Sequence, residues 1–132
     1  MKRSLSRFLL LPLLAVVLAA PLGALSGLLD GHKFSGETGE KGKAKGNPED
    51  FVFATGEIDP LACHKYGFAK TPYQATEEGG TVHFVAEHTN AKGEKMKWTG
   101  SVHGDLLEGT MQYWPKPGGK PSDYWFKAKK VQ

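Results

Sequence analysis

Cys63 and His64 are the adjacent residues whose side chains best suit covalent chemistry. A cysteine acts as a nucleophile when a base lies within hydrogen-bond reach of its thiol and a third group orients that base. Adjacent residues of an extended segment point to opposite faces, so His64 is poorly placed to activate Cys63. We therefore interpret Cys63 as a buried thiol that packs as a small apolar residue. Because the chain has a single cysteine, an intermolecular disulfide or a reactive, redox-sensitive thiol is the alternative.

Five histidines raise the question of a metal site. Metal ligands must converge on one point, whereas His83 and His88 fall on opposite faces of one predicted strand. The other three, His32, His64 and His103, have no evident partner. We predict no metal and no cofactor. Since no acid, base and nucleophile converge either, we predict a non-enzymatic protein.

Aromatic and sulfur-containing residues recur at alternate positions through the second half of the chain, which is typical of the inner face of β-strands. The residues expected to line the interior are Tyr73, Phe84, His88, Met96, Trp98, Met111, Tyr113, Tyr124 and Phe126. Two interpretations are open: a cavity that holds a small apolar or amphipathic molecule, or a packed core. The small residues between the rings, Gly100 and Gly109 above all, favour the cavity. His88, near one end, either orients a ligand head group or is solvated or bonded to the backbone.

The strands that carry these residues are set by the segment 95–114, in which two alternating runs flank Gly104-Asp105. Glycine in the first central position suits a type II′ hairpin turn. Folding the chain at this turn fixes the register, because one face becomes apolar and the other mostly polar. The predicted inward pairs are Met96–Tyr113, Trp98–Met111, Gly100–Gly109 and Val102–Leu107.

The same alternation extends to both sides of this hairpin. Turns at Gly79-Gly80 and at residues 91–93 connect the preceding strands. They predict the pairs Tyr73–Ala86, Ala75–Phe84, Val82–Val102, Phe84–Gly100, Ala86–Trp98 and His88–Met96. After the hairpin, the predicted pairs are Tyr113–Tyr124, Met111–Phe126 and Gly109–Ala128, with Glu108 opposite Lys129 on the outer face. Five consecutive strands thus share one inner face.

Three shorter strands are expected earlier, over residues 32–36, 51–54 and 57–61. Residues 37–47, rich in glycine and lysine, are expected to form a flexible loop. A second irregular connection, with three prolines, follows Trp114, and no segment of the mature chain carries a helical period. We predict an all-β fold, an eight-stranded antiparallel up-and-down barrel, because closure removes exposed strand edges. A β-sandwich is the alternative.

Several residues resemble those of lipocalins and of their wider calycin relatives, the avidins. Gly31 to Phe34 lies where lipocalins carry a Gly-x-Trp signature on the first strand, with Phe34 in place of tryptophan. Segment 37–47 resembles their large first loop, and Trp98-Thr99-Gly100 is similar to a Trp-Ser-Gly of avidin strands. The resemblance implies a barrel architecture and a general ligand-binding role.

Residues 1–26 are typical of a signal peptide, with a basic head, an apolar run from Phe8 to Ala20 and a cleavage motif before Gly27. An uncleaved membrane anchor is the alternative, since no charge occurs from Phe8 to Leu29. Residues 27–132 are then one domain, exported to the periplasm or secreted, without stable membrane insertion after cleavage. The chain has 17 basic and 14 acidic residues. Because the three-residue excess lies before Gly27, the mature chain is neutral and gives no reason to expect nucleic acid or an anionic membrane as partner.

The predicted function is therefore to hold a small apolar or amphipathic molecule inside the barrel. A second hypothesis is a protein-binding module, such as an inhibitor or an envelope accessory factor, that uses the outer face. Val85, Leu106, Trp114 and Trp125 fall on that face. An apolar outer face also suits a homodimer.

Overall fold

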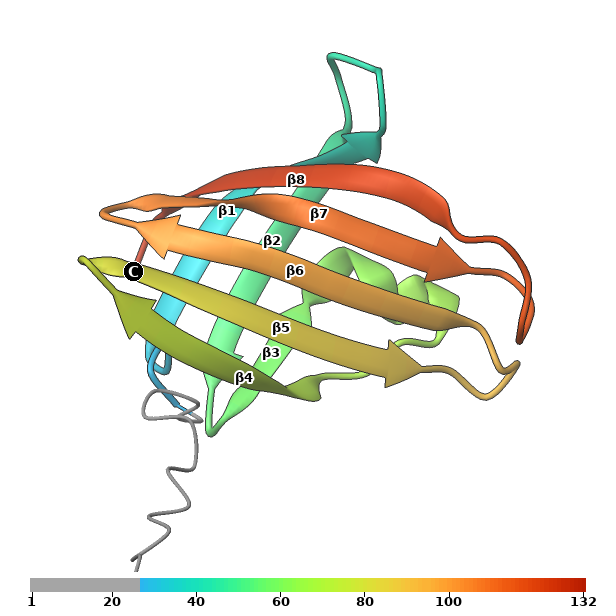
Figure 1. Ribbon diagram of the computed structural model, residues 1–132, viewed down its shortest axis with the longest axis horizontal. Coiled ribbons are helices and arrows are strands. Elements are labelled where there is room, and N and C mark those ends of the chain that lie inside the picture. Colours follow the sequence, from blue (N-terminus) through green and yellow to red (C-terminus); the bar gives the residue numbers. More distant parts are fainter. Residues whose placement is uncertain (1–26) are drawn as a thin grey trace, which may run out of the picture.

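The computed structural model describes residues 27–132, in which eight antiparallel strands close into an up-and-down barrel (Figure 1). The prediction of this fold is confirmed, and the alternative of an open sandwich is wrong. The strands are β1 (His32–Glu40), β2 (Asn47–Ala54), β3 (Glu57–Pro60), β4 (Thr71–Glu78), β5 (Thr81–Thr89), β6 (Lys95–His103), β7 (Leu106–Trp114) and β8 (Ser122–Lys130). One 3₁₀ helix, η1 (Leu61–Tyr66), joins β3 to β4. The predicted signal peptide lies outside the described residues.

The register predicted from the hairpin turns is confirmed from β4 to β7. Tyr73 lies opposite Ala86, and Trp98 lies between Ala86 and Met111. The glycines of the central hairpin, Gly100 and Gly109, face each other as predicted. Two two-residue turns and the glycine-containing connection between β5 and β6 therefore carried enough information to align four strands.

The predicted register between β7 and β8 is wrong by two residues. Phe126 lies opposite Gly109, not Met111, and Glu108 lies opposite Lys127, not Lys129. A two-residue shift keeps every side chain on its predicted face, so alternation alone does not detect it. The correct register places the Phe126 ring over Gly109, with ring carbon Cζ 2.7 Å from where a Cβ of that glycine would stand. Packing, rather than the irregular connection before β8, selects this register.

The first strands differ from the prediction in length. β1 continues to Glu40 and β2 begins at Asn47, so the predicted loop over 37–47 is reduced to residues 41–46. Pairing explains the extension: Thr38 lies opposite Asn47, and Glu40 lies opposite Tyr124 of β8. Backbone hydrogen bonds to two neighbouring strands outweigh a composition that favours a loop.

Helix η1 was not predicted, because six residues are too few to show a helical period. The third strand ends at Pro60, and the chain turns into the helix there. Gly67 ends it in the left-handed conformation with φ of 85°. Among the described residues, no helix is long and apolar enough to span a membrane.

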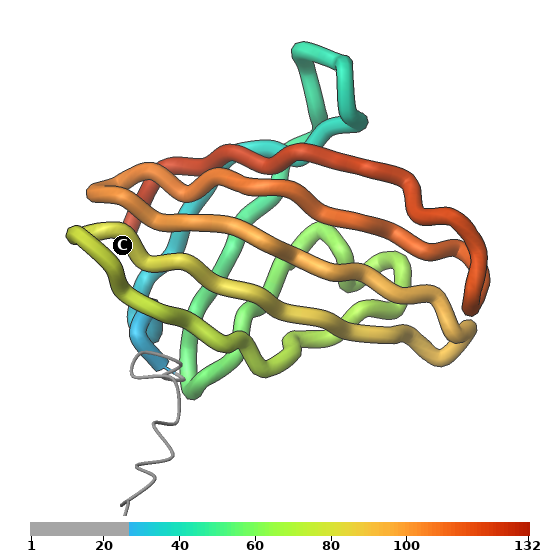
Figure 2. Tube along the Cα trace, in the orientation of Figure 1, coloured from blue at the N-terminus to red at the C-terminus, as the bar shows by residue number. Residues whose placement is uncertain are grey.

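The two ends of the barrel differ in the length of their connections. The turns 55–56, 79–80 and 104–105 lie at one end, together with residues 27–31 before β1. The longer connections 41–46, 61–70, 90–94 and 115–121 all lie at the other end, which we call the open end. Figures 1 and 2 show the β1–β2 connection projecting from the barrel, the β5–β6 and β7–β8 connections together at one side, and η1 following the end of β3 behind β5 and β6. Any site built from loops must therefore form at the open end.

The opposite end is closed by the segment that precedes β1. Leu29 is buried there, and its backbone N–H donates to the Tyr73 hydroxyl at 2.8 Å. That hydroxyl in turn donates to Asp30, whose carboxylate also accepts from the Gly56 N–H. Burial and the bond to Asp30 raise the pKa of Tyr73, so the hydroxyl stays a donor. Residues 27–31 thus plug the barrel with their polar groups satisfied.

The half of the interior near this plug is packed with aromatic rings. Phe53 meets Tyr73 and Phe84 edge to face, at 5.1 and 5.4 Å between ring centroids. Phe84 and Phe126 occupy the space above Gly100 that the sequence suggested was free, with ring carbons 2.8 and 2.6 Å from where its Cβ would stand. The glycines therefore admit rings of the protein itself, which fill the space beside them.

Replacing Gly109 with valine is expected to destabilise the barrel by at least about 2 kcal/mol, because overpacking a core strains it. A Cβ at Gly109 would meet the Thr99 carbonyl oxygen at 2.2 Å. Urea unfolding measures the change, and Gly104→Asn is the control, since nothing lies within 4 Å of its Cβ position and asparagine tolerates positive φ. Equal stability of the two variants would contradict this account of the core.

Candidate ligand-binding site

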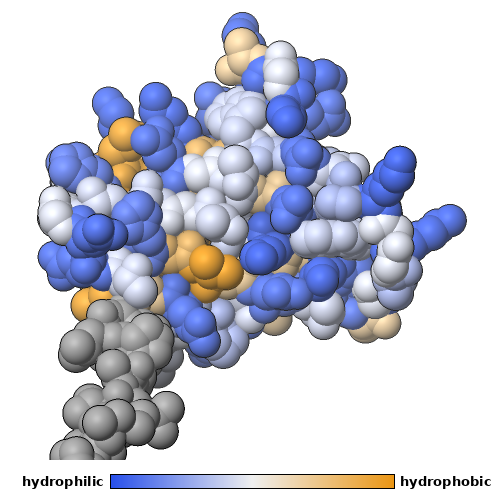
Figure 3. All heavy atoms as spheres, viewed as in Figure 1, coloured by the Kyte–Doolittle hydropathy of each residue, from blue (hydrophilic) through white to orange (hydrophobic). Residues whose placement is uncertain are grey.

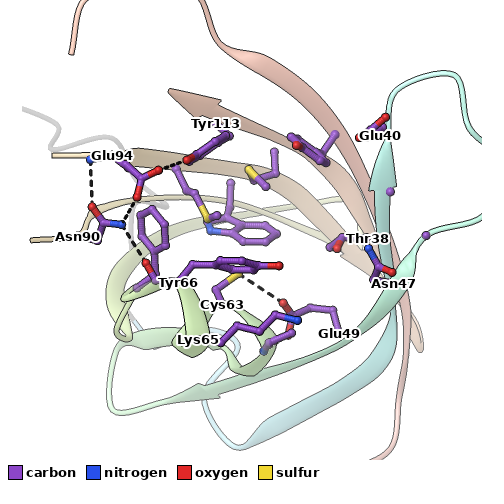
Figure 4. A pocket seen from close by; sticks show the side chains of 18 of the residues that line it. Thr38, Glu40, Asn47, Glu49, Cys63, Lys65, Tyr66, Asn90, Glu94 and Tyr113 are labelled. Carbon is purple, nitrogen blue, oxygen red and sulfur yellow. Dashed lines mark hydrogen bonds between the residues drawn. The ribbon is translucent and has the colours of Figure 1, made fainter. Parts of the chain in front are cut away.

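A pocket of about 940 Å³ lies at the open end of the barrel. Its walls come from β1, β2, β6, β7 and β8, and from three connections: residues 41–46, the segment that contains η1, and residues 90–94. Figure 4 shows Tyr66 and Tyr113 on facing sides of this pocket, with Glu49 and Cys63 beneath Tyr66. The remaining half of the interior, near the closed end, is solid, so the barrel is divided across its middle.

Trp98 forms the division between core and pocket. Its indole packs on Phe51 and Phe126, with ring centroids 5.5 and 5.4 Å away, and none of its surface is exposed. Met96 and Met111 lie beside it on the pocket side and expose 7% and 5% of their surfaces. Unbranched methionines adapt their shape readily, so the pocket has an apolar and adjustable floor.

Five of the nine residues predicted to line the interior do line this pocket: Met96, Trp98, Met111, Tyr113 and Tyr124. The other four do not border it. Tyr73, Phe84 and Phe126 belong to the packed core. His88 is buried and bonded to Trp98 rather than placed at the rim. Alternation identifies the inner face of a strand, but not how far along the barrel axis the packed core extends.

His88 is held between two fixed partners. Its Nε2 accepts the indole N–H of Trp98 at 3.0 Å, and its Nδ1 donates to the Ala69 carbonyl at 2.8 Å. An indole N–H only donates, so the histidine must be neutral and protonated at Nδ1. Burial lowers the pKa of His88 and favours this form. The residue therefore fixes the position of Trp98.

Sequence reasoning missed the side of the pocket formed by β2 and η1. Glu49, Cys63, Tyr66 and Phe68 line it, and all but Tyr66 are buried. Glu49 lies between the predicted loop over 37–47 and the strand predicted over 51–54, so nothing indicated that its carboxyl would turn inward. The signal that was available is the glycine after Tyr66, which is typical of a helix end and would have indicated a short helix across the mouth.

Glu49 fastens η1 to the barrel. Its Oε1 accepts the backbone N–H of Ala62 at 2.7 Å and that of Asp50 at 2.9 Å, while its Oε2 accepts the Cys63 thiol at 3.5 Å. Burial raises the pKa of Glu49, and these hydrogen bonds act in the opposite direction. The carboxyl satisfies a backbone donor at the start of the helix that no other residue reaches. It is therefore a structural anchor that also borders the pocket.

Cys63 is not placed for nucleophilic chemistry. Its buried thiol donates to Glu49, and burial together with the nearby carboxylate raises its pKa well above the usual range. His64 points elsewhere and pairs with Asp59 at 2.5 Å. The geometric reason given from the sequence needs correction, because the two residues lie on a helix and not on a strand. The interpretation of Cys63 as a buried thiol agrees with its 6% exposure.

The opposite side of the mouth is held by a polar network. The Asn90 side chain donates to the Tyr66 carbonyl at 2.9 Å and to the Glu94 carboxylate at 2.8 Å. The Tyr113 hydroxyl donates to the same carboxylate, which lowers the pKa of Glu94 and raises the pKa of Tyr113 to about 12. Three separate segments are thereby joined, so this side of the pocket is preformed.

The β1–β2 connection is held against β8. Trp125 donates its indole N–H to the Lys43 carbonyl at 2.8 Å, and its ring lies where a Cβ on Gly39 would stand. The Lys41 N–H donates to the Asp123 carbonyl at 3.0 Å. These contacts give the segment 41–46 a defined position beside the pocket.

Lysines gather at the open end. Figure 3 shows hydrophilic side chains there and over the projecting β1–β2 connection. The four longer connections contain a single acidic residue, Glu94. Their eight lysines are Lys41, Lys43, Lys45, Lys65, Lys70, Lys92, Lys116 and Lys120. Within residues 27–132, no three His, Cys, Asp or Glu side chains gather as they would around a metal ion.

Comparison of the chain with protein-family models, with curated proteins and with solved structures finds no match. The chemistry of the pocket therefore has to be read from its own residues.

The neutral state of His88 predicts how stability depends on pH. The pKa of His88 is lowered in the fold from its ordinary value of 6.5, so below that pH the unfolded chain binds a proton that the folded protein excludes. Stability should fall on acidification through this window, by at most about 1.4 kcal/mol per pH unit from this residue. His88→Gln, whose amide can donate to Ala69 and accept from Trp98, should lose less over the same range in urea unfolding.

Glu49, with its raised pKa, acts in the opposite sense in both proteins and cancels in this comparison. Identical pH dependence of wild type and His88→Gln would show that His88 is not held neutral.

Proposed function

We propose that this protein is a non-enzymatic binding protein for a small amphipathic molecule, held in the pocket at the open end. The observation that carries the proposal is the pocket itself, about 940 Å³ in volume and preformed over an apolar floor. Sites for small molecules are typically concave, preformed and of this size. The location differs from the sequence-based expectation, because the ligand occupies the mouth of the barrel and not its centre.

The lining suits a molecule with an apolar and a polar part. Met96, Met111 and Phe68 offer an apolar surface at the base. The Tyr66 and Tyr113 rings also line the pocket, and the Tyr113 hydroxyl donates to Glu94. Tyr66 is 59% exposed, although burial of a ring that size is favourable. A bound apolar group that packs against this ring would remove part of that exposed surface from water.

The absence of an activated thiol supports a binding role over catalysis. Cys63 is the one nucleophile of its kind in the chain, and its raised pKa keeps it in the unreactive thiol form. Its contact with Glu49 is that of a buried packing residue. Export, the resemblance to lipocalins and avidins, and the choice between periplasm and secretion remain parts of the proposal that the sequence motivates.

The rival hypothesis, a protein-binding outer face, receives little support from the tryptophans that motivated it. Trp125 is bonded to the β1–β2 connection and covers Gly39, and Trp114 is covered by the Lys95 ammonium at 4.4 Å from the ring centroid. Both tryptophan rings thus have partners within the chain. Of the four residues that motivated the hypothesis, Val85 is the exposed one, at 42%.

A neutral fluorescent probe, N-phenyl-1-naphthylamine, tests the proposal. The probe should bind the purified mature protein with one-to-one stoichiometry and brighten as it leaves water. Met111→Trp enlarges a residue at the pocket floor and should weaken probe binding by at least about tenfold, because it fills the space that the probe needs.

Leu106→Trp is the matched control, since Leu106 lies on the outer face and borders no part of this pocket. Ala62→Trp, which enlarges a second lining residue on η1, guards against a folding defect of Met111→Trp. Binding that survives both pocket variants, or that is lost only in Leu106→Trp, would overturn the proposal.

A further inference from the structure

We propose that the ligand is an acidic amphiphile, whose anionic head group lies among the lysines of the mouth while its apolar part rests on the pocket floor. This inference rests on the proposed function and adds the charge and the orientation of the ligand. The inference is based on where the charged side chains lie in the fold. The net charge of the mature chain, which is zero, does not reveal this distribution.

The connections at the two ends of the barrel differ in charge. The connections at the open end contain eight lysines and one acidic residue, whereas the segments at the closed end contain two aspartates, Asp30 and Asp105, and no lysine. The mature chain has equal numbers of basic and acidic residues, so the excess at one end is balanced elsewhere. Clustered charge of one sign around a concave site attracts ligands of the opposite sign.

Four of these lysines border the pocket itself: Lys43, Lys45, Lys65 and Lys92. They come from three connections far apart in the sequence, so the fold alone brings them to one mouth. Lys43 is paired with Glu40 at 3.0 Å. For the other three, no carboxylate lies within 4.0 Å among the described residues. The Lys65 ammonium lies 5.2 Å from the centroid of the Tyr66 ring, at the edge of the pocket.

The four lysines of the lining outnumber its three acidic residues, Glu40, Glu49 and Glu94. Glu40 pairs with Lys43, and Glu94 is a carboxylate that accepts hydrogen bonds from Tyr113 and Asn90. Glu49 is 3% exposed and lies at the wall beneath Tyr66. The mouth therefore keeps a small excess of positive charge, carried by exposed lysines, while the buried carboxyl lies deeper.

The position of Glu49 predicts how the ligand is oriented in the pocket. A second anion brought close to this buried carboxyl would be repelled, because charges interact strongly where water is excluded. An anionic head group is therefore unfavourable at the base of the pocket and favourable at the lysine-bordered mouth. The apolar part of the ligand then meets Met96 and Met111, and Trp98 supports it from below.

Three ten-carbon ligands that differ only in head group test the inference: decanoate, decanol and decylamine. Each displaces the neutral probe, so affinities are compared without modifying the protein. Decanoate should bind at least about fivefold more tightly than decanol, and decylamine most weakly, because each exposed ion pair adds up to about fivefold in affinity. Added salt should reduce this preference while leaving decanol unchanged.

The variant Lys45→Glu/Lys65→Glu/Lys92→Glu should lose the preference for decanoate and bind decylamine more tightly than wild type, with decanol unaffected. The control Lys127→Glu/Lys129→Glu/Lys130→Glu makes the same change of net charge on β8, near the closed end. It should keep the wild-type order. This pair of variants separates local charge at the mouth from the charge of the whole protein.

The outcomes distinguish the two proposals. If none of the three ligands displaces the probe, or the probe itself does not bind in the pocket, the proposed function fails. If all three ligands bind equally, the pocket binds amphiphiles but does not prefer an acidic head group. If decylamine binds best, the preference for an acidic head group is also wrong, and Glu49 rather than the lysines selects the ligand. The inference is also overturned if the control variant loses as much affinity for decanoate as the variant with glutamates at the mouth.

Discussion

Closure of an even-numbered up-and-down barrel is the constraint on which the rest of this structure depends. Each strand reverses direction, so connections alternate between the two ends. Because β1 pairs with β8 as well as β2, no edge remains and every connection is committed to one end. In this chain the tight turns fall at one end and the long, lysine-rich connections at the other. Because short and long connections alternate along the sequence, the barrel has one end closed by tight turns and one end where long connections surround the pocket.

Buried polar groups then fix the boundary between core and pocket. His88 holds the indole of Trp98, and Glu49 holds the start of η1. Each makes hydrogen bonds that only one arrangement satisfies, and a buried polar group left unsatisfied is costly. Within the described residues, no buried side-chain nitrogen or oxygen lacks a partner. Trp98 and the start of η1 are therefore held in fixed positions, whereas the methionines of the pocket floor and the exposed lysines of its mouth can adapt.

Much of the fold could be predicted from the sequence, because period-two alternation and glycine turns are local signals. They aligned β4 to β7 and gave the correct number of strands. The predictions that were wrong are those that depend on side-chain packing. The β8 register depends on the Phe126 ring seated over Gly109, and the depth of the core depends on Phe84 filling space that the glycines left. The inward turn of Glu49 and the short helix beside it depend on each other, and neither leaves a strong local pattern.

The central claim is that a small amphipathic molecule enters the open end and rests on the methionines beside Trp98. Methionine methyl resonances report this directly, because Met96 and Met111 both border the pocket and are the only methionines after residue 1. Adding decanoate to protein labelled at the methionine methyls should shift both signals together, saturating at one equivalent. Methionine signals that stay unchanged as decanoate is added in excess would contradict the account.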